Sequence, residues 1–143
     1  MEKNWQGMSE LAATWRRNGD AVVAIVGPAE IERQTAIAAD VVIAGEPLSR
    51  VAAVLHRADQ YVGNDSGISH LAGLLGVYAF VLFADSDPAV WKPSGPRLRV
   101  LRAAPACDVC EPRQFCIHRL PVARVHEVVS EPNSTVAITS DGA

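Results

Sequence analysis

A short stretch of small and polar residues between two apolar segments has the composition of an anion site. It reads Gly63-Asn64-Asp65-Ser66-Gly67 and is followed by Ile68, Ser69 and His70, which the apolar spacing places in the first turn of a helix. A helix start presents unpaired backbone N–H groups and about half a positive charge, and glycine lets a phosphate approach the backbone closely. The hydroxyls of Ser66 and Ser69 and the imidazole of His70 add further donors. These residues predict a phosphate site.

The same residues also suit a purely structural helix start. Asn64, Asp65 and Ser66 are residue types that cap helices, and the flanking glycines permit a tight turn. Position favours a ligand, because the turn follows a predicted strand and α/β folds bind ligands beyond the carboxyl ends of their strands. The glycine spacing differs from GxGxxG and from a Walker P-loop, so neither an NAD site nor a Walker-type ATP site is indicated.

Apolar periodicity changes several times along the chain, as it does when strands alternate with helices. Strands are predicted at 21–26, 41–43, 60–62, 79–83 and 98–101. Helices are predicted from Ser9 as N-cap to Asn18, and at 30–39, 48–58, 67–75 and 121–130. This alternation predicts an α/β fold with a doubly wound parallel sheet and flanking helices over residues 1–130. Residues 131–143 contain turn-forming residues and little periodicity, so we expect a loose tail there.

Composition narrows the function classes. The 143 residues are 49% hydrophobic and 20% charged, which suits one globular domain, and the formal net charge is −3. A nucleic-acid partner is not expected, because the basic excess that binds a phosphate backbone is missing. No apolar run is long enough to span a bilayer and the N-terminal residues do not resemble an export signal, so we expect a cytoplasmic protein.

The cysteines form a local cluster. Cys107, Cys110, Cys116 and His118 offer four possible zinc ligands within twelve residues. One CxxC pair with so close a third cysteine is a compressed geometry for zinc, so we predict free or loosely paired thiols and no metal. Structural zinc remains the alternative.

The longest motif is similar to that of a known family. The segment GNDSGISHLAGLLGVYAFVLFADSDPAVWKPSG, residues 63–95, contains DSG, then HLA after two residues, a strand, a turn ending in DP, and WxPxG. It resembles glycosyltransferase family 9, the ADP-heptose:lipopolysaccharide heptosyltransferases, in their C-terminal domain, and the resemblance extends from Lys3 to Val129. This chain departs from the family pattern in having DSGISHLA for DSGPMHLA, and Ala84 in place of a glycine after LF.

The resemblance implies roles for individual residues. Lys3 in KNW would reach a donor phosphate, and Glu30 in GPAEIE would hold the donor ribose hydroxyls; the alternatives are a solvated lysine and an acid favoured by a helix dipole. The residues around the donor diphosphate and its sugar would be Asp65, Ser66, Gly67, Ser69 and His70. Phe83 to Pro88 would form part of the cleft wall.

The family also implies a reaction and partners. Its members resemble two-domain GT-B enzymes, so this chain is expected to be the Rossmann-like half that binds an ADP-heptose-type donor for lipopolysaccharide core synthesis. The acceptor and the catalytic base would come from an N-terminal domain, and an isolated chain would be inactive. No cofactor is implied beyond the ADP-sugar substrate, and no catalytic residue is identified.

The resemblance also implies a missing strand and possible partners, and one alternative function stays open. The family places a strand just before KxW, so the domain is expected to lack its first strand and to need an acceptor domain or a second copy as partner. In the full enzyme, peripheral contact with a membrane lipid acceptor is implied. A free-standing, non-catalytic nucleotide or nucleotide-sugar module is the alternative function. The sequence identifies neither the sugar nor the acceptor.

Overall fold

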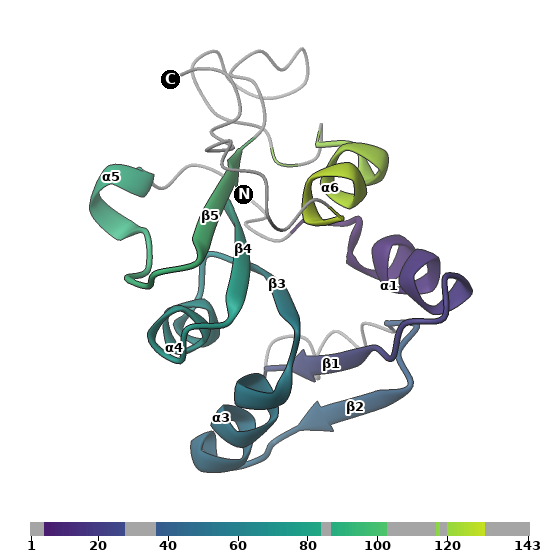
Figure 1. Cartoon of the computed structure of the whole chain (residues 1–143), viewed down its shortest axis with the longest axis horizontal. Coiled ribbons are helices and arrows are strands. Elements are labelled where there is room, and N and C mark those ends of the chain that lie inside the picture. Colours follow the sequence, from purple (N-terminus) through teal and green to yellow (C-terminus); the bar gives the residue numbers. More distant parts are fainter. Residues whose placement is uncertain (1–4, 28–36, 84–86, 103–116, 118–119, 131–143) are drawn as a thin grey trace.

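The computed structural model describes residues 5–27, 37–83, 87–102, 117 and 120–130, and within them helices alternate with strands everywhere except between β1 and β2 (Figure 1). The helices are α1 (Met8–Arg17), α3 (Leu48–Arg57), α4 (Gly67–Leu74), α5 (Pro88–Trp91) and α6 (Val122–Val129). The strands are β1 (Val23–Val26), β2 (Val41–Ala44), β3 (Gln60–Asn64), β4 (Tyr78–Phe83) and β5 (Leu98–Arg102). The predicted α/β class is confirmed.

All five described strands are parallel to their neighbours, but they form two sheets rather than one. One sheet pairs β1 with β2, and the other has the order β3-β4-β5. In the second sheet Asn64 is opposite Leu82, and Phe83 is opposite Arg102, so the carboxyl ends of its three strands lie at one edge. This is the edge where a ligand site is expected in a parallel sheet.

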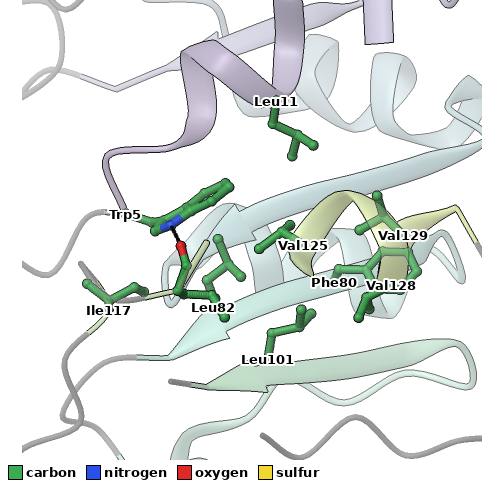
Figure 2. Close-up of a cluster of buried hydrophobic side chains, with 10 residues drawn as sticks. Trp5, Leu11, Phe80, Leu82, Leu101, Ile117, Val125, Val128 and Val129 are labelled. Carbon is green, nitrogen blue, oxygen red and sulfur yellow. Dashed lines mark hydrogen bonds between the residues drawn. The ribbon is translucent and has the colours of Figure 1, made fainter. Parts of the chain in front are cut away.

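Apolar side chains on alternate residues of β4 supply two cores. Phe80 and Leu82 belong to the first core, with α1, α6 and Leu101 of β5, and Figure 2 shows these side chains converging between the helices and the strands. Ala79 belongs to the second core, with residues of α3 and α4. Because β4 is covered on both faces, its sequence YAFVLF is almost continuously apolar.

Three predicted boundaries need correction. Helix α1 begins after Gly7, so Ser9 lies inside the helix and is not its N-cap. Strand β3 extends through Asn64, because its ladder with β4 continues that far. In α3, Val51 and Leu55 carry the packing, whereas Leu48 at its start is 63% exposed. Pro121 is the N-cap of α6 and stands before its first turn.

Other predictions fall outside the described residues. These are most of the helix expected at 30–39, the three cysteines and the tail at 131–143. Within the expected helix, residues 37–39 are described and have no regular structure.

Helix α4 lies unusually close to the segment that follows α5. A Cβ on Gly73 would stand 2.5 Å from the Ser94 backbone oxygen, and a Cβ on Gly95 would stand 2.4 Å from the Gly73 oxygen. Only residues without a side chain permit such an approach of two backbones. Gly95, the glycine of the WxPxG motif, therefore allows its own segment to pack directly against the backbone of α4.

Candidate anion site at the start of helix α4

The predicted phosphate turn lies at the carboxyl end of β3. The Asp65 N–H donates to the Leu82 carbonyl oxygen at 3.2 Å, which ties the turn to the end of β4. Ser66 then adopts an extended conformation, and its Oγ accepts from the Ser69 N–H at 3.5 Å as the N-cap of α4. This arrangement turns the chain directly from strand into helix at the ligand-binding edge of the sheet.

The helix start is open on its outer side. Gly67 is exposed, and a Cβ built on it would meet no atom within 4 Å. The Gly67 and Ile68 N–H groups precede the first backbone hydrogen bond of the helix, which runs from His70 N–H to the Ser66 oxygen at 3.3 Å. Exposed N–H groups at the positive end of a helix dipole suit an anion. His70 is also exposed, and Asp65 is half-buried.

Ser69 is placed differently from the sequence-based expectation. Its side chain is completely buried, and its Oγ donates to the Asn64 carbonyl oxygen at 2.6 Å. The Tyr61 hydroxyl lies 3.1 Å from the same Oγ, and it must be the donor there because the single Ser69 hydroxyl proton is already used. Ser69 therefore stabilises the turn from inside, and its hydroxyl faces away from the position of a ligand outside Gly67.

Tyr61 completes this internal network. Burial raises the pKa of its hydroxyl, and the hydrogen bonds with Ser69 and Ser66 oppose that rise. The phenol therefore stays protonated across the physiological range and keeps donating to Ser69. The network below the turn is neutral, so it carries no charge that would compensate the positive end of the helix dipole.

Trp5 connects the N-terminal segment to the same turn. Its backbone N–H donates to Asn64 Oδ1 at 3.0 Å, and its indole Nε1–H donates to the Leu120 oxygen at 2.8 Å. The indole is 4% exposed and packs in the first core, where Figure 2 draws its bond to the chain before α6. The KxW pattern suggested a role for its lysine. The structure shows that its tryptophan fixes the N-terminal segment to Asn64 and to the chain before α6.

Lys3 and Glu30 lie outside the described residues. The other predicted residues lie together at the start of α4, and among them the Ser69 side chain points inward: Asp65, Ser66, Gly67, Ser69 and His70. Sequence reasoning missed Arg102, which ends β5 at the same sheet edge and is half-buried. The available signal was a cation at the carboxyl end of the strand LRVLR, which also contains Arg99.

Other features of the described surface do not indicate a different site. Two shallow hollows in the described part of the chain lie away from the turn, one beside α1 and Asp40 and one at the amino ends of β3 and β4. Within the described ranges, no group of three His, Cys, Asp or Glu residues is arranged to hold a metal ion. None of the helices in that part of the chain is long and apolar enough to cross a membrane.

The sequence of this chain matches one known protein family. The family described as "Glycosyltransferase family 9 (heptosyltransferase)" matches residues 1–117. No curated protein sequence is significantly similar to this chain.

Several solved structures are similar in fold, of which three are described here. A family 9 glycosyl transferase from Veillonella parvula has a TM-score of 0.75 at 19% identity, over 92% of this chain and 42% of its own. E. coli heptosyltransferase WaaC with ADP has a TM-score of 0.74 at 25% identity, and the match covers 91% of this chain and 40% of the WaaC chain. E. coli ADP-heptose LPS heptosyltransferase II has a TM-score of 0.74 at 23% identity, and the match covers 91% of this chain and 42% of that one. This chain thus spans about two fifths of the length of each.

Proposed function

The chain belongs to glycosyltransferase family 9, and from that premise we propose that it is the donor-binding half of a heptosyltransferase, holding the diphosphate of an ADP-sugar at the start of α4. The observation that carries the proposal is the open Gly67 corner at the carboxyl end of β3, where a helix N-terminus faces outward. ADP is the nucleotide to test first, because the similar E. coli WaaC structure is described with ADP.

Each residue of the turn receives a distinct role. The Gly67 and Ile68 N–H groups donate to diphosphate oxygens, and the exposed His70 imidazole adds a donor one turn along the helix. Asp65 is a carboxylate and would repel phosphate, so it accepts from sugar hydroxyls instead. Ser66 caps the helix and Ser69 supports it from below.

Lys3 and Glu30 extend the site in this proposal. Lys3 donates to a donor phosphate, the role that the family resemblance implies for the lysine of KNW, two residues before Trp5 in the sequence. Glu30 binds the ribose hydroxyls through its two carboxylate oxygens.

The proposed reaction needs more than this chain. An acceptor hydroxyl oxygen attacks the anomeric carbon of the sugar, the bond from that carbon to the diphosphate breaks, and ADP leaves with the electron pair. The helix dipole, Lys3 and His70 stabilise the departing charge. A base must take the hydroxyl proton, and we assign it, with the acceptor, to an N-terminal domain. The acceptor proposed is a lipopolysaccharide core sugar on a lipid at the cytoplasmic side of the membrane.

Titration calorimetry with ADP, ADP-heptose, UDP-sugars and GDP-sugars tests the donor site directly. His70→Ala should weaken ADP by about 1 to 3 kcal/mol, roughly 5- to 150-fold, and leave adenosine nearly unchanged, because only the diphosphate meets the imidazole. The matched control is His56→Ala, which removes another exposed imidazole, on α3. Equal loss for adenosine and ADP, or equal effects of the two variants, would contradict the assignment.

A further inference from the structure

A cation ends one strand of the three-stranded sheet at the edge where the phosphate turn lies. Strand β3 ends at Asn64, β4 at Phe83 and β5 at Arg102, so Arg102 is the charged one of these three described strand ends. The Asp65 carboxylate already brings a negative charge to this edge, and a diphosphate would bring more. A fixed positive charge at the edge offsets both, and Arg102 is placed to supply it.

The alternation of side chains along β5 puts Arg102 on the α4 side of the sheet. Leu101 belongs to the first core, with α1 and α6, whereas Leu98 packs against the second core, with α3 and α4. Successive side chains of a strand point to opposite faces, so Arg102, four residues after Leu98, shares the face of Leu98. Phe83, its partner in the ladder, is completely buried. The cation therefore leaves the sheet on the side where α4 begins.

The separation between Arg102 and the turn suits a ligand lying between them. Neighbouring strands lie about 4.8 Å apart, so the Arg102 backbone is about 10 Å from the end of β3, two strands away. An arginine side chain covers most of that distance, and a phosphate group fills the remainder. The side chain also has a set direction, because its Nε is buried and the residue as a whole is half-buried. A cation oriented in advance costs less to order when a ligand binds.

The guanidinium can bind a phosphate and keep a contact within the protein. Arg102 already takes part in an interaction inside the chain. Its planar fork offers several N–H donors, and a phosphate accepts a pair of them side by side. The guanidinium also stays charged across the physiological range. An internal contact therefore orients the fork without using up its capacity for a phosphate.

The direction of the donor decides which phosphate Arg102 meets. In the proposed function Glu30 holds the ribose, and Glu30 follows β1 in the sequence. Figure 1 shows the β1–β2 pair on the β3 side of the three-stranded sheet, so β5 is the strand of that sheet farthest from β1. A donor with its ribose toward β1 and its diphosphate at the start of α4 extends its sugar toward β5. Arg102 then faces the sugar-linked phosphate rather than the ribose-linked one.

We propose that Arg102 binds the sugar-linked phosphate of the donor and makes the site prefer nucleoside diphosphates to monophosphates. As the acceptor oxygen attacks the anomeric carbon, the bond from that carbon to the phosphate oxygen breaks and the electron pair stays on the oxygen. The guanidinium stabilises the charge that develops there. The inference rests on the proposed donor site, to which it adds one residue and one preference.

Titration calorimetry of the full chain with ADP and AMP tests the proposal. AMP carries only the ribose-linked phosphate, so Arg102→Gln should weaken ADP binding by at least about tenfold and leave AMP binding nearly unchanged. Arg99→Gln is the matched control, because it makes the same change in the same strand on the opposite face, and it should leave both ligands unaffected. A loss for Arg102→Gln that is equal for ADP and AMP, or no loss for either, would overturn the proposal.

The wild-type titrations separate this proposal from the donor site itself. If wild type binds ADP and Arg102→Gln binds it equally well, the donor site stands and the role of Arg102 is wrong. If wild type binds neither nucleotide, both proposals are wrong. Should Arg102→Gln fail to fold in circular dichroism, Arg102→Lys replaces it, because lysine keeps the charge and loses the planar fork. A several-fold loss for ADP alone then supports the proposal, and an equal change for both ligands, or none, overturns it.

Discussion

Replacing Ser69 with Ala separates a supporting role from a direct contact with the ligand. The substitution removes the hydroxyl that donates to the Asn64 oxygen at 2.6 Å and accepts from Tyr61 at 3.1 Å. It adds no bulk at a completely buried position, so steric effects stay small. The expected result is a less stable protein whose remaining folded fraction still binds ADP through the outer face of the helix start.

The magnitude follows from the two bonds. Losing the Ser69–Asn64 hydrogen bond costs about 1 kcal/mol net, and removing the Ser69 partner of the partly buried Tyr61 hydroxyl costs about 1 to 3 kcal/mol more. The free energy of unfolding should therefore fall by about 2 to 4 kcal/mol. Tyr61→Phe alone should cost about 1 kcal/mol, and the double variant should cost less than the sum, because removing both partners leaves no orphaned hydroxyl.

Urea denaturation measures this cycle. With a slope of about 2 kcal/mol per molar urea, the midpoint of Ser69→Ala should fall by about 1 to 2 M. Calorimetry with ADP is then performed well below the unfolding temperature, where the variant is folded. A Ser69→Ala protein with unchanged stability and abolished ADP binding would refute the reasoning, because it would mean that the hydroxyl faces the ligand.

Three other substitutions probe the framework around the turn, and a fourth probes a carboxylate beside α1. Gly73→Ala places a methyl group against a backbone oxygen and should lower stability by about 1 to 3 kcal/mol in thermal unfolding, whereas Gly67→Ala, with open space around it, should not. Trp5→Phe deletes the buried indole hydrogen bond and should cost about 1 to 3 kcal/mol in urea, with no loss expected if the anchor is unimportant. The Val22 N–H, which donates to Asp40, and the nearby Arg16 guanidinium hold the pKa of this carboxyl below its usual 3.8. The carboxylate therefore stabilises the folded state above that pH, and the stabilisation is lost as pH falls through the lower folded value. The stability difference between wild type and Asp40→Asn should shrink on acidification, and a difference that is constant with pH would contradict this.

The positions of the strands were predictable because burial on both faces makes a strand apolar throughout. The run from Ala79 to Phe83 is an example, and it is found at the centre of its sheet. Periodicity could not predict the division into two sheets, because a strand paired on one edge, such as β1, has the same residue pattern as a strand paired on both edges. Pairing depends on which other strand is present, and that information lies outside the local sequence.

The orientation of Ser69 was missed for a different reason. A hydroxyl at a helix start suggests a donor to an anion, but a residue in the first turn can point inward or outward. Ser69 shares its face with Ala72 and Gly73, three and four residues later, and all three are buried. This row of small residues was visible in the sequence and would have indicated an inward side chain, because small residues allow α4 to lie close to the sheet.

Asn64 explains why the turn, the helix and the N-terminal segment form one unit. Its backbone oxygen accepts from Ser69 inside α4, and its side-chain oxygen accepts from the Trp5 N–H at the entrance to α1. The residue is also the last one of β3, so the ladder with β4 fixes the position from which both bonds extend. A phosphate at Gly67 would therefore meet groups whose relative positions are set by a single strand end, and this pre-arrangement lowers the cost of ordering them when a ligand binds.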